Sequence, residues 1–587
     1  MDGGRASLNI PARARISSGP ILTQFRRILP WIIPLGFLAL FYFYPLIKIV
    51  QVSYTRSPAG VGASIWEALN SPLLLRVTWF TFWQASLSAF LTLVIGLPGA
   101  YLLARYDFRG KSLLQALFGI PFVMPTLVVA AAFYAMVGPN GWVNLGLMTA
   151  LKLEDPPVVL TNSIYAILLA HVFYNTTIVL RVIGDFWSRM DSRLVLAARS
   201  LGASRWQAFR RISLPLLSPA ILAAALLVFI FDFTSFGVIL VLGGPRYATL
   251  EVEIYYQTVG LFNLPLAATL SLLQLGCTLA LTVIYTRMSA RVSRPISLQS
   301  SRSSMHQLAD WRAKLTAGVI LIILFILLTA PLIGLAARSL TRFELERGER
   351  GEPERGFTLD FYRELGINRR NALFYVPPTT AIGISLGYAG LTVLISLLVG
   401  LPAAWALARD RQSTLNRVLD PVLMLPLGTS AVTLGLGFIV ALNQPPLDLR
   451  TSPLLVPLAH ALVAFPFVVR SLTPALQSIR PRLRQAASVL GASPAHVIRR
   501  IDLPLVGRAV LVASTFAFTI SLGEFGATAL IARPEYPTIP LAIYRFISQP
   551  GAMNYGQALA LSTILMIVAA SGMLLIEKLR IAEIGEF

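Results

Sequence analysis

Long apolar runs separated by short polar segments dominate the chain. The first six runs cover residues 30–50, 77–104, 113–137, 160–182, 217–242 and 264–285, and the second six cover residues 315–336, 379–408, 418–440, 454–469, 505–531 and 558–576. A helix needs about 20 such residues to cross the hydrocarbon core of a bilayer. The pattern therefore predicts an all-α integral membrane protein with about twelve transmembrane helices.

Composition supports a membrane location. Apolar residues (AVILMFWYC) make up 56% of the chain and charged residues only 13%, which is more apolar surface than a water-soluble core needs. The net charge of +22 could indicate nucleic-acid binding, but the arginines and lysines gather where predicted spans end. Under the positive-inside rule they place the N-terminus in the cytoplasm of a multi-pass protein of the cell (inner) membrane. The basic but Glu-rich loop at 338–370 falls outside and is a weak guide to orientation.

The first apolar run and the single cysteine each allow two interpretations. Arg13, Arg15, Arg26 and Arg27 precede the first run, as basic residues do in a signal peptide. The run has full span length and no small-residue cleavage site follows it, so we expect a retained first helix. Cys277 has no second cysteine with which to form an internal disulfide, and we expect it to be a small core residue.

An internal repeat divides the chain. Residues 194–219 (LVLAARSLGASRWQAFRRISLPLLSP) and 483–508 (LRQAASVLGASPAHVIRRIDLPLVGR) are identical at 13 of 26 positions, 289 residues apart, where unrelated segments would share roughly two. The earlier spans of the two halves also correspond to each other, with equivalent residues 304 positions apart. Equivalent segments run the same way through six helices, so we predict two six-helix repeats of parallel topology. The halves are 1–286 and 315–587, joined by a cytoplasmic linker at 287–314.

The repeated segments, 190–216 and 479–505, each predict two short helices joined at a glycine, and are termed the first and second knuckles. Gly202 and Gly491 end the first short helix, because glycine readily adopts the backbone conformation that follows a helix. Ser204 and Ser493 are residue types suited to cap the second short helix.

A Leu-Pro pair, at 214–215 and again at 503–504, is predicted to end the second short helix before the chain re-enters the membrane. Such a basic amphipathic segment could simply lie on the membrane surface. A surface anchor needs no duplicated Gly-Ala-Ser turn, whereas docking onto a two-fold symmetric partner does. We therefore expect both knuckles to be docking surfaces.

The knuckles resemble the cytoplasmic EAA loop in permease subunits of binding-protein-dependent ABC importers: Ala-Ala, three residues, Gly-Ala, then an Arg-rich stretch that ends in Leu-Pro. The fused arrangement is similar to the permeases for thiamine and for ferric iron, over nearly the whole chain. Residues 169–175 (LAHVFYN) and 521–526 (SLGEFG) strengthen the resemblance.

In that family the short helix of the loop fits a groove in a nucleotide-binding subunit, so the resemblance implies two ATPase-coupling surfaces. Their residues would be Ala197, Ala198, Gly202, Ala203, Arg210, Arg211, Ala486, Ala487, Gly491, Ala492, Arg499 and Arg500. The chain departs from the family at the first loop position, where Leu196 and Gln485 replace Glu. A salt bridge assigned to that Glu is therefore absent here, and coupling must depend on shape and on the neighbouring arginines.

The resemblance also implies the partners. Two copies of an ABC ATPase subunit would bind on the cytoplasmic side and hold ATP and Mg, and an external or periplasmic solute-binding protein would dock on outer loops such as 138–157 and 534–554. We expect no nucleic acid partner, and membrane lipid as the surroundings.

We expect no enzyme activity and no cofactor in the chain itself. Gly110-Lys111-Ser112 imitates the end of a phosphate-binding loop, but the glycine required five residues earlier is Arg105. The four histidines are too scattered for a metal site, and no catalytic cluster of a membrane enzyme is recognisable. His171 and His460, which are repeat-equivalent, are expected to pack or hydrogen-bond near helix starts.

Acidic residues within predicted spans are rare. Asp232 lies in the fifth span, and Glu524 lies in the eleventh at the place equivalent to Ser235. A charge at the bilayer centre costs about 2.5 to 3.5 kcal/mol unless it is paired or hydrated, so we expect both carboxylates to face the interface between the halves. They could line the translocation path of a cationic substrate, or make structural hydrogen bonds to a neighbouring helix. The sequence leaves both interpretations open.

The predicted function is therefore that of a permease whose two halves rock against each other when bound ATPase subunits close and pull the knuckles together. Ferric iron and thiamine are the two substrates that the resemblance favours. The competing class is a gradient-driven secondary transporter with two six-helix halves. Such a protein would carry ionisable groups within the membrane for ion coupling and would need no duplicated docking loop.

Overall fold

The computed structural model of the chain describes residues 20–55, 71–158, 160–292, 306–307, 310–342, 356–367, 376–409, 413–443, 445 and 447–584. Among these residues, eleven helices are long and apolar enough to cross a membrane, or up to twelve if one bent pair counts as a single span. The prediction of an all-α membrane protein is confirmed.

The first half begins with α1 and ends with α14. Its helices are α1 (Pro20–Leu38), α2 (Tyr44–Thr55), α4 (Pro72–Arg105), α5 (Lys111–Val123), α6 (Thr126–Val137), α7 (Trp142–Leu151), α8 (Ile164–Arg189), α9 (Ser192–Ser200), α10 (Arg205–Ala208), α11 (Leu214–Phe233), α12 (Gly237–Leu242), α13 (Leu250–Tyr255) and α14 (Leu264–Val292). Short turns join some of them, namely the π-helical η1 (Ala39–Phe43), η2 (Phe209–Ser213) and η4 (Tyr256–Gly260) and the 3-10 turn η3 (Pro245–Tyr247).

The second half repeats this order. Its helices are α15 (Trp311–Ser339), α16 (Asp360–Arg363), α17 (Pro378–Arg409), α18 (Thr414–Met424), α19 (Ala431–Ala441), α20 (Leu455–Ser478), α21 (Pro481–Val489), α22 (Pro494–Val497), α23 (Leu503–Gly523), α24 (Gly526–Ile531), α25 (Ile539–Ile547) and α26 (Ala552–Ile584). The 3-10 turns η6 (Glu364–Gly366) and η7 (Leu425–Gly428) and the π-helical turn η8 (Ile498–Asp502) complete it.

Two short strand pairings connect distant parts of the chain. β1 (Tyr106–Asp107) pairs in parallel with β2 (His306–Gln307), and β3 (Thr341–Arg342) pairs antiparallel with β4 (Gly356–Phe357). The first pairing ties the predicted linker to the end of α4. The flanking helices α14 and α15 both extend into that linker, whose residues 293–305 and 308–309 lie outside the described part of the chain.

The core of each half is the same trio of helices. α4, α8 and α11 pack together in the first half, and the equivalent α17, α20 and α23 pack together in the second. Glycine allows the close approach: a Cβ at Gly96 would lie 2.6 Å from Cγ1 of Val179, and a Cβ at the equivalent Gly400 would lie 2.8 Å from Cγ1 of Val468. Small residues let membrane helices come close enough for van der Waals packing, which replaces the hydrophobic effect between helices in lipid.

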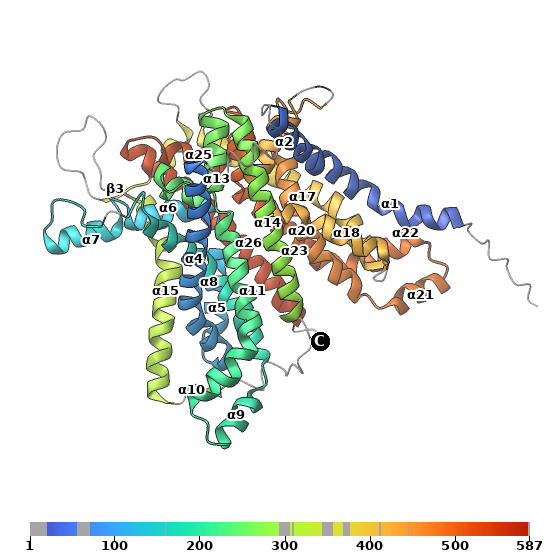
Figure 1. Cartoon of the computed structure of the whole chain (residues 1–587), viewed down its shortest axis with the longest axis horizontal. Coiled ribbons are helices and arrows are strands. Elements are labelled where there is room, and N and C mark those ends of the chain that lie inside the picture. Colours follow the sequence, from blue (N-terminus) through green and yellow to red (C-terminus); the bar gives the residue numbers. More distant parts are fainter. Residues whose placement is uncertain are drawn as a thin grey trace, which may run out of the picture.

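The first helix of each half packs against the other half. α1 packs on α17 and α2 on α19, while α15, the first helix of the second half, packs on α6. Helices α4, α8, α11 and α14 stand roughly upright in Figure 1, whereas α17, α20 and α23 run obliquely. The halves therefore diverge toward the ends that carry α9–α10 and α21–α22, whereas α13 and α25 lie at the opposite end (Figure 1).

The prediction of continuous third spans is wrong in both halves. The run 113–137 divides into α5 and α6, and the run 418–440 divides into α18 with η7 and then α19, a pair bent by 95°. Pro125 lies in the first break, and Pro426 lies in η7 of the second. Proline has no N–H to donate and disfavours the helical conformation of the residue before it, so each span breaks beside a proline.

The fifth spans are also broken, contrary to the continuous runs predicted at 217–242 and 505–531. α11 ends at Phe233 and α12 begins at Gly237, and α23 ends at Gly523 and α24 begins at Gly526. A buried histidine from a neighbouring helix contacts each break.

The Leu-Pro pair does not end the second helix of either knuckle, which corrects a further prediction. Helix runs without interruption over Arg205–Phe233 and over Ala495–Gly523. A π-helical turn precedes each pair, and in the first knuckle the N–H of Leu214 donates to the carbonyl of Phe209. The wider turn changes the register of the helix just before Pro215, where the ring of a proline would otherwise clash with the preceding turn.

Candidate coupling surfaces and translocation path

The first knuckle is a rigid helix-turn-helix. Gly202 has φ +88°, a left-handed conformation, and the N–H of Ala203 donates to the carbonyl of Ala198 at 3.0 Å. The N–H of Gly202 donates to the carbonyl of Arg199 at 3.1 Å. This pair of bonds satisfies the last carbonyls of α9, as in a Schellman motif.

A capping box starts the second short helix of that knuckle. The N–H of Gln207 donates to Oγ of Ser204 at 3.2 Å, and the N–H of Ser204 donates to Oε1 of Gln207 at 2.9 Å. Two of the amides that a helix start leaves without a partner are thereby satisfied. The capping role expected of Ser204 is confirmed.

The second knuckle has the same geometry. Gly491 has φ +84°, the N–H of Ala492 donates to the carbonyl of Ala487 at 3.0 Å, and the N–H of His496 donates to Oγ of Ser493 at 3.3 Å. The repeated sequence therefore builds the same turn twice, one at each of the diverging ends in Figure 1.

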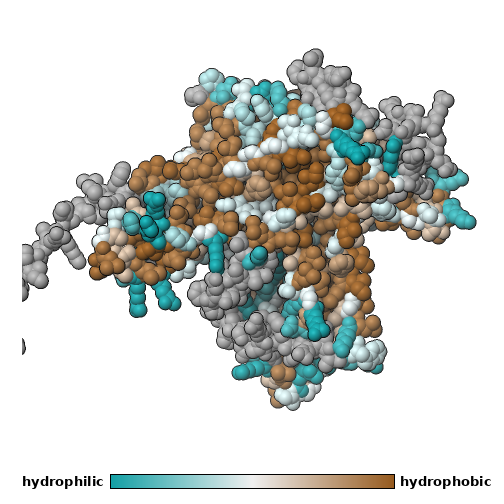
Figure 2. Space-filling view, turned by 180° about the vertical axis from the view of Figure 1, so that it is seen from behind, coloured by the Kyte–Doolittle hydropathy of each residue, from teal (hydrophilic) through white to brown (hydrophobic). Residues whose placement is uncertain are grey.

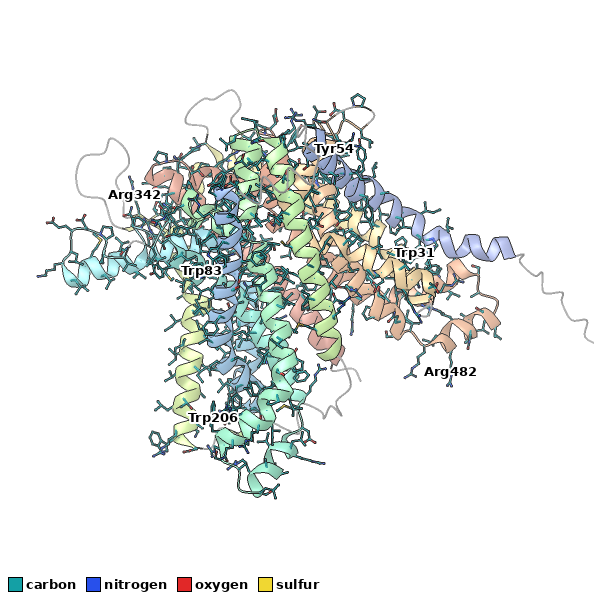
Figure 3. The ribbon with its side chains drawn as sticks, in the orientation of Figure 1. Trp31, Tyr54, Trp83, Trp206, Arg342 and Arg482 are labelled. Atoms are coloured by element: carbon teal, nitrogen blue, oxygen red, sulfur yellow. The ribbon has the colours of Figure 1, made fainter. Side chains whose placement is uncertain are left out.

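All twelve residues predicted for the coupling surfaces are exposed or half-buried. Polar residues gather at the diverging ends of the two halves, while apolar surface covers the sides of both halves (Figure 2). Figure 3 places Arg482 at the exposed end of the second knuckle.

The structure adds two leucines to these surfaces. Leu201 is 88% exposed and the equivalent Leu490 is 87% exposed, each directly before the glycine of its turn. A large apolar side chain that is fully exposed at two equivalent points is typical of a surface that a partner covers.

The break in the fifth span of the first half is held by His171. Its Nε2 lies 2.9 Å from Oγ of Ser235, and its Nδ1 lies 3.4 Å from Oδ1 of Asp232. Nδ2 of Asn175 donates to Oδ1 of Asp232 at 2.6 Å, and Nε2 of Gln84 donates to the carbonyl of Asp232 at 2.9 Å. Helices α4 and α8 therefore supply hydrogen bonds to the end of α11, where the helix has no partners of its own.

His460 holds the equivalent break in the second half. Its Nδ1 lies 2.8 Å from Oγ of Ser521, and its Nε2 lies 2.8 Å from Oγ1 of Thr528 and 3.2 Å from Oε2 of Glu524. The carboxylate of Glu524 also accepts from the N–H groups of Ala527 and Thr528, at 2.9 and 3.1 Å. An acid at the start of a helix is stabilised by these free amides and by the helix dipole.

The two histidines bond the same pair of positions, with the residue types exchanged. His171 contacts an acid at 232 and a serine at 235, and His460 contacts a serine at 521 and an acid at 524. Each half therefore keeps one histidine, one serine and one carboxylate at its break. The carboxylate has moved by one turn of helix between the halves.

An aromatic cluster lies where the two breaks meet. The rings of Phe236 and Phe525 stack across the interface between the halves, with centroids 5.4 Å apart and an interplanar angle of 22°. Tyr255 lies 5.4 Å from Phe236, and Tyr544 lies 5.4 Å from Phe525. These four residues, termed the aromatic quartet, are two repeat-equivalent pairs. Gly237 allows close packing beside them, since a Cβ there would lie 2.5 Å from Oγ1 of Thr126 and 3.3 Å from Cδ1 of Phe525.

The chain matches the family described as binding-protein-dependent transport system inner membrane component, over residues 96–343 and again over 396–579. It belongs to that family. The two matches, one largely in each half, agree with the internal repeat and with the two knuckles.

Named relatives of this permease extend over nearly its whole length. The thiamine transport system permease protein ThiP of Salmonella typhimurium is 26% identical over 533 residues, covering 90% of this chain and 92% of the relative. ThiP of Brucella abortus is 27% identical, covering 89% and 90%. The probable ABC transporter permease protein y4fN of Sinorhizobium fredii is 25% identical, covering 93% and 95%.

The solved structure of a bacterial ABC transporter involved in the import of alginate, an acidic polysaccharide, matches with 19% identity and a TM-score of 0.39. The match covers 47% of this chain and 99% of that one.

A buried acid that sequence reasoning missed joins the two halves of the permease. Glu251 of α13 is 1% exposed, and its Oε1 accepts from Nε2 of Gln274 at 2.6 Å. Its Oε2 accepts from Oγ of Ser430 at 2.5 Å, across the interface between the halves. The segment lies between two predicted spans, and only the packing of α13 against other helices shows that Glu251 is buried.

The three residues predicted to line the translocation path lie beside the histidines of the two breaks. Asp232 is 1% exposed and Glu524 is 8% exposed, while Ser235 is half-buried, and all three bond histidines of their own half. Phe236 and Phe525 directly follow Ser235 and Glu524 in the chain. The histidine network therefore positions the rings that meet between the halves.

Lys111, part of the Gly-Lys-Ser triplet, donates from Nζ to the carbonyl of Tyr106 at 2.9 Å. Gly110 precedes α5 with φ +85°. The triplet thus forms the start of a short apolar helix after a turn.

Proposed function

We propose that this permease imports thiamine, delivered by an external solute-binding protein and driven by ATP hydrolysis in two separate ATPase subunits. The observation that carries the proposal is the pair of matching knuckles in a chain whose relatives named for thiamine transport cover about nine-tenths of its length. Those names favour thiamine over ferric iron. ATP and Mg would be held by the ATPase subunits.

The knuckles would transmit the movement. Each presents an exposed leucine, two alanines and a glycine-alanine turn on a short helix, a shape suited to a groove in a partner subunit. Because each second short helix continues into α11 or α23, a displacement of the knuckle moves a membrane-spanning helix directly. Drawing the two knuckles together would close the divergence between the halves.

The aromatic quartet would close the path on the outer side while the knuckle ends diverge. Two stacked rings, one from each half, exclude water and ions, and they separate when the halves rock apart. Thiamine carries a positive ring, which aromatic faces attract. Each nucleotide state shifts this balance only through its different affinity for the two conformations.

Transport by the assembled complex tests the proposal. The permease, its ATPase and the binding protein would be reconstituted in vesicles, and uptake of labelled thiamine measured with and without ATP on the cytoplasmic side. We expect uptake that needs ATP, the binding protein and both knuckles. Uptake driven by an ion gradient with the permease alone would identify a secondary transporter. Transport of ferric iron in place of thiamine by the same complex would identify the other substrate.

A further inference from the structure

A cavity of about 850 Å³ lies beside the first knuckle, bounded by α4, α8, α9 and α10. None of the predicted coupling residues lines it. The residues that do are Val94, Leu97, Pro98, Tyr101, Arg105, Tyr106, Trp187, Val195, Leu196, Arg199, Arg205, Trp206, Phe209 and Ser213. We term this cavity the first groove.

The first groove is apolar at one end and cationic at the other. Val94, Leu97 and Pro98 lie within α4, one of the helices long and apolar enough to cross a membrane, and Arg105 is the last residue of that helix. Arg199 and Arg205 belong to the exposed knuckle. Its ligand would have a long apolar part and an anionic head.

Aromatic rings line the middle of the first groove. Tyr101 lies 5.1 Å from Trp187, and Phe209 stacks between Trp187 and Trp206 at 6.3 and 5.7 Å. Aromatic side chains with a polar edge are typical of the boundary between hydrocarbon and headgroups. Figure 3 places Trp206 near the end of the first half that carries the first knuckle.

The three arginines have no acidic partner in the described ranges of the chain. Arg105 is only 8% exposed. A buried cation is costly unless an anion neutralises it, and guanidinium groups bind phosphate oxygens with charge-assisted hydrogen bonds.

The repeat supplies an internal comparison. The equivalent groove of the second half has a volume of about 210 Å³ and is lined by Leu401, Pro402, Trp405, Leu476, Ile498, Leu503, Val506, Asp502 and Pro30. Pro30 belongs to α1, so α1 contributes to the wall of this groove. Ser488 and Pro494 stand where the first half has Arg199 and Arg205.

The second groove also carries its own negative charge. Asp502 stands at the position of Ser213 and bonds Nε of Arg484 at 2.8 Å. The first groove thus has the larger volume. Its lining holds three arginines and no acidic residue. The first groove is therefore the better suited of the two to an anionic ligand.

We propose that the first groove binds an anionic phospholipid, with its phosphate between Arg105, Arg199 and Arg205 and an acyl chain along Val94, Leu97 and Pro98. Val94 lies eleven residues before Arg105 on one helix, or about 16 Å at the helical rise of 1.5 Å per residue. That depth is in the hydrocarbon region, which an acyl chain reaches and a cytosolic protein does not. Basic pockets between membrane helices on the cytoplasmic side bind such headgroups.

Brominated lipids test the proposal, because bromine quenches nearby tryptophan and Trp187 and Trp206 line the first groove. Full-length permease in phosphatidylcholine nanodiscs would be titrated with brominated phosphatidylglycerol or brominated phosphatidylcholine. We expect saturable quenching at a low mole fraction of phosphatidylglycerol only, with a reduced amplitude in Trp206→Phe. Equal quenching by both lipids would overturn the proposal.

Variants of the arginines, with Arg199→Ser taken from the equivalent Ser488 of the second half, sharpen the test. Arg199→Ser combined with Arg205→Ala should raise the half-saturating lipid fraction about tenfold or more, since two charge-assisted contacts are lost. Ser213→Asp, which adds the acid of the second groove, should act in the same direction. Arg482→Ala, an exposed arginine of the second knuckle outside either groove, is the matched control and should leave the titration unchanged.

Two further outcomes would contradict the proposal. Displacement of the lipid by millimolar inorganic phosphate would indicate a site for phosphate alone. Unchanged lipid quenching, together with lost ATPase association in the arginine variant, would assign the first groove to the ATPase interface. The lipid titration uses the permease without its partners, so its result does not depend on the transported substrate.

Discussion

Phe236 and Phe525 stack on each other across the interface between the halves, 289 residues apart in the chain and equivalent by the internal repeat. Each ring follows a break in the fifth span of its half, and each break is held by an equivalent histidine, His171 or His460. The pair therefore lies on the symmetry axis that relates the halves. A movement that separates the two halves would break this contact.

Removal of the stacked rings tests their role as a seal. We expect the double variant Phe236→Ala, Phe525→Ala to let thiamine leak out of vesicles that contain the permease, even in the absence of ATP. The reason is that the other two residues of the quartet do not replace the stacked pair. Efflux of preloaded labelled thiamine measures the leak. Phe229→Ala is the matched control, since Phe229 stacks on Phe233 within one helix. An unchanged efflux rate in the double variant would place the seal elsewhere.

The glycines of the knuckles require a left-handed backbone. A Cβ at Gly202 or Gly491 would meet nothing within 4 Å, so any effect of substitution comes from the backbone and not from a clash. A β-branched residue in that conformation costs about 1 to 2 kcal/mol, whereas Asn tolerates it. We expect Gly202→Val with Gly491→Val to abolish ATPase association in a pull-down, and the Asn pair to preserve it. Equal binding by both pairs would show that the turn is not needed for docking.

His460 joins three polar side chains at the break after α23. His460→Ala would leave Ser521, Thr528 and Glu524 without this partner in a buried site, so we expect a loss of about 2 to 4 kcal/mol in the free energy of unfolding. Thermal unfolding of the purified permease would show it as a lower midpoint. His496→Ala, at an exposed position of the second knuckle, is the control. The same midpoint for both variants would contradict a structural role.

The contact between Glu251 and Ser430 couples the two halves. A double-mutant cycle with Glu251→Gln and Ser430→Ala should give a coupling free energy of about 0.5 to 3 kcal/mol, the range for residues that share a hydrogen bond. Midpoints of thermal unfolding for the four proteins provide the measurement. Strictly additive effects would mean that the bond does not contribute to the stability of the interface.

The spans, the repeat and the knuckles could be predicted because each depends on local sequence. Apolar runs of span length must lie in lipid, and the Gly-Ala-Ser turn has its hydrogen-bond partners within a few residues, as Ser204 and Gln207 show. The family resemblance came from the same segment and is confirmed over both halves.

The breaks in the fifth spans could not be predicted, because their stabilising partners lie on other helices. In the sequence, Ser235 and Glu524 are part of an apolar run. Only the folded structure shows that His171 and His460 lie beside them. Glu251 was missed for the same reason, since its partner Ser430 belongs to the other half. The contrast between the two grooves likewise depends on where α1 packs.

The sequence alone therefore determined that the chain crosses the membrane in two similar halves, each with a docking turn, because burial in lipid and local hydrogen bonds act over short stretches. The tertiary structure decided where the spans break, which rings meet between the halves and which groove is the larger. Those outcomes depend on side chains hundreds of residues apart, whose polar groups must find each other once water is excluded.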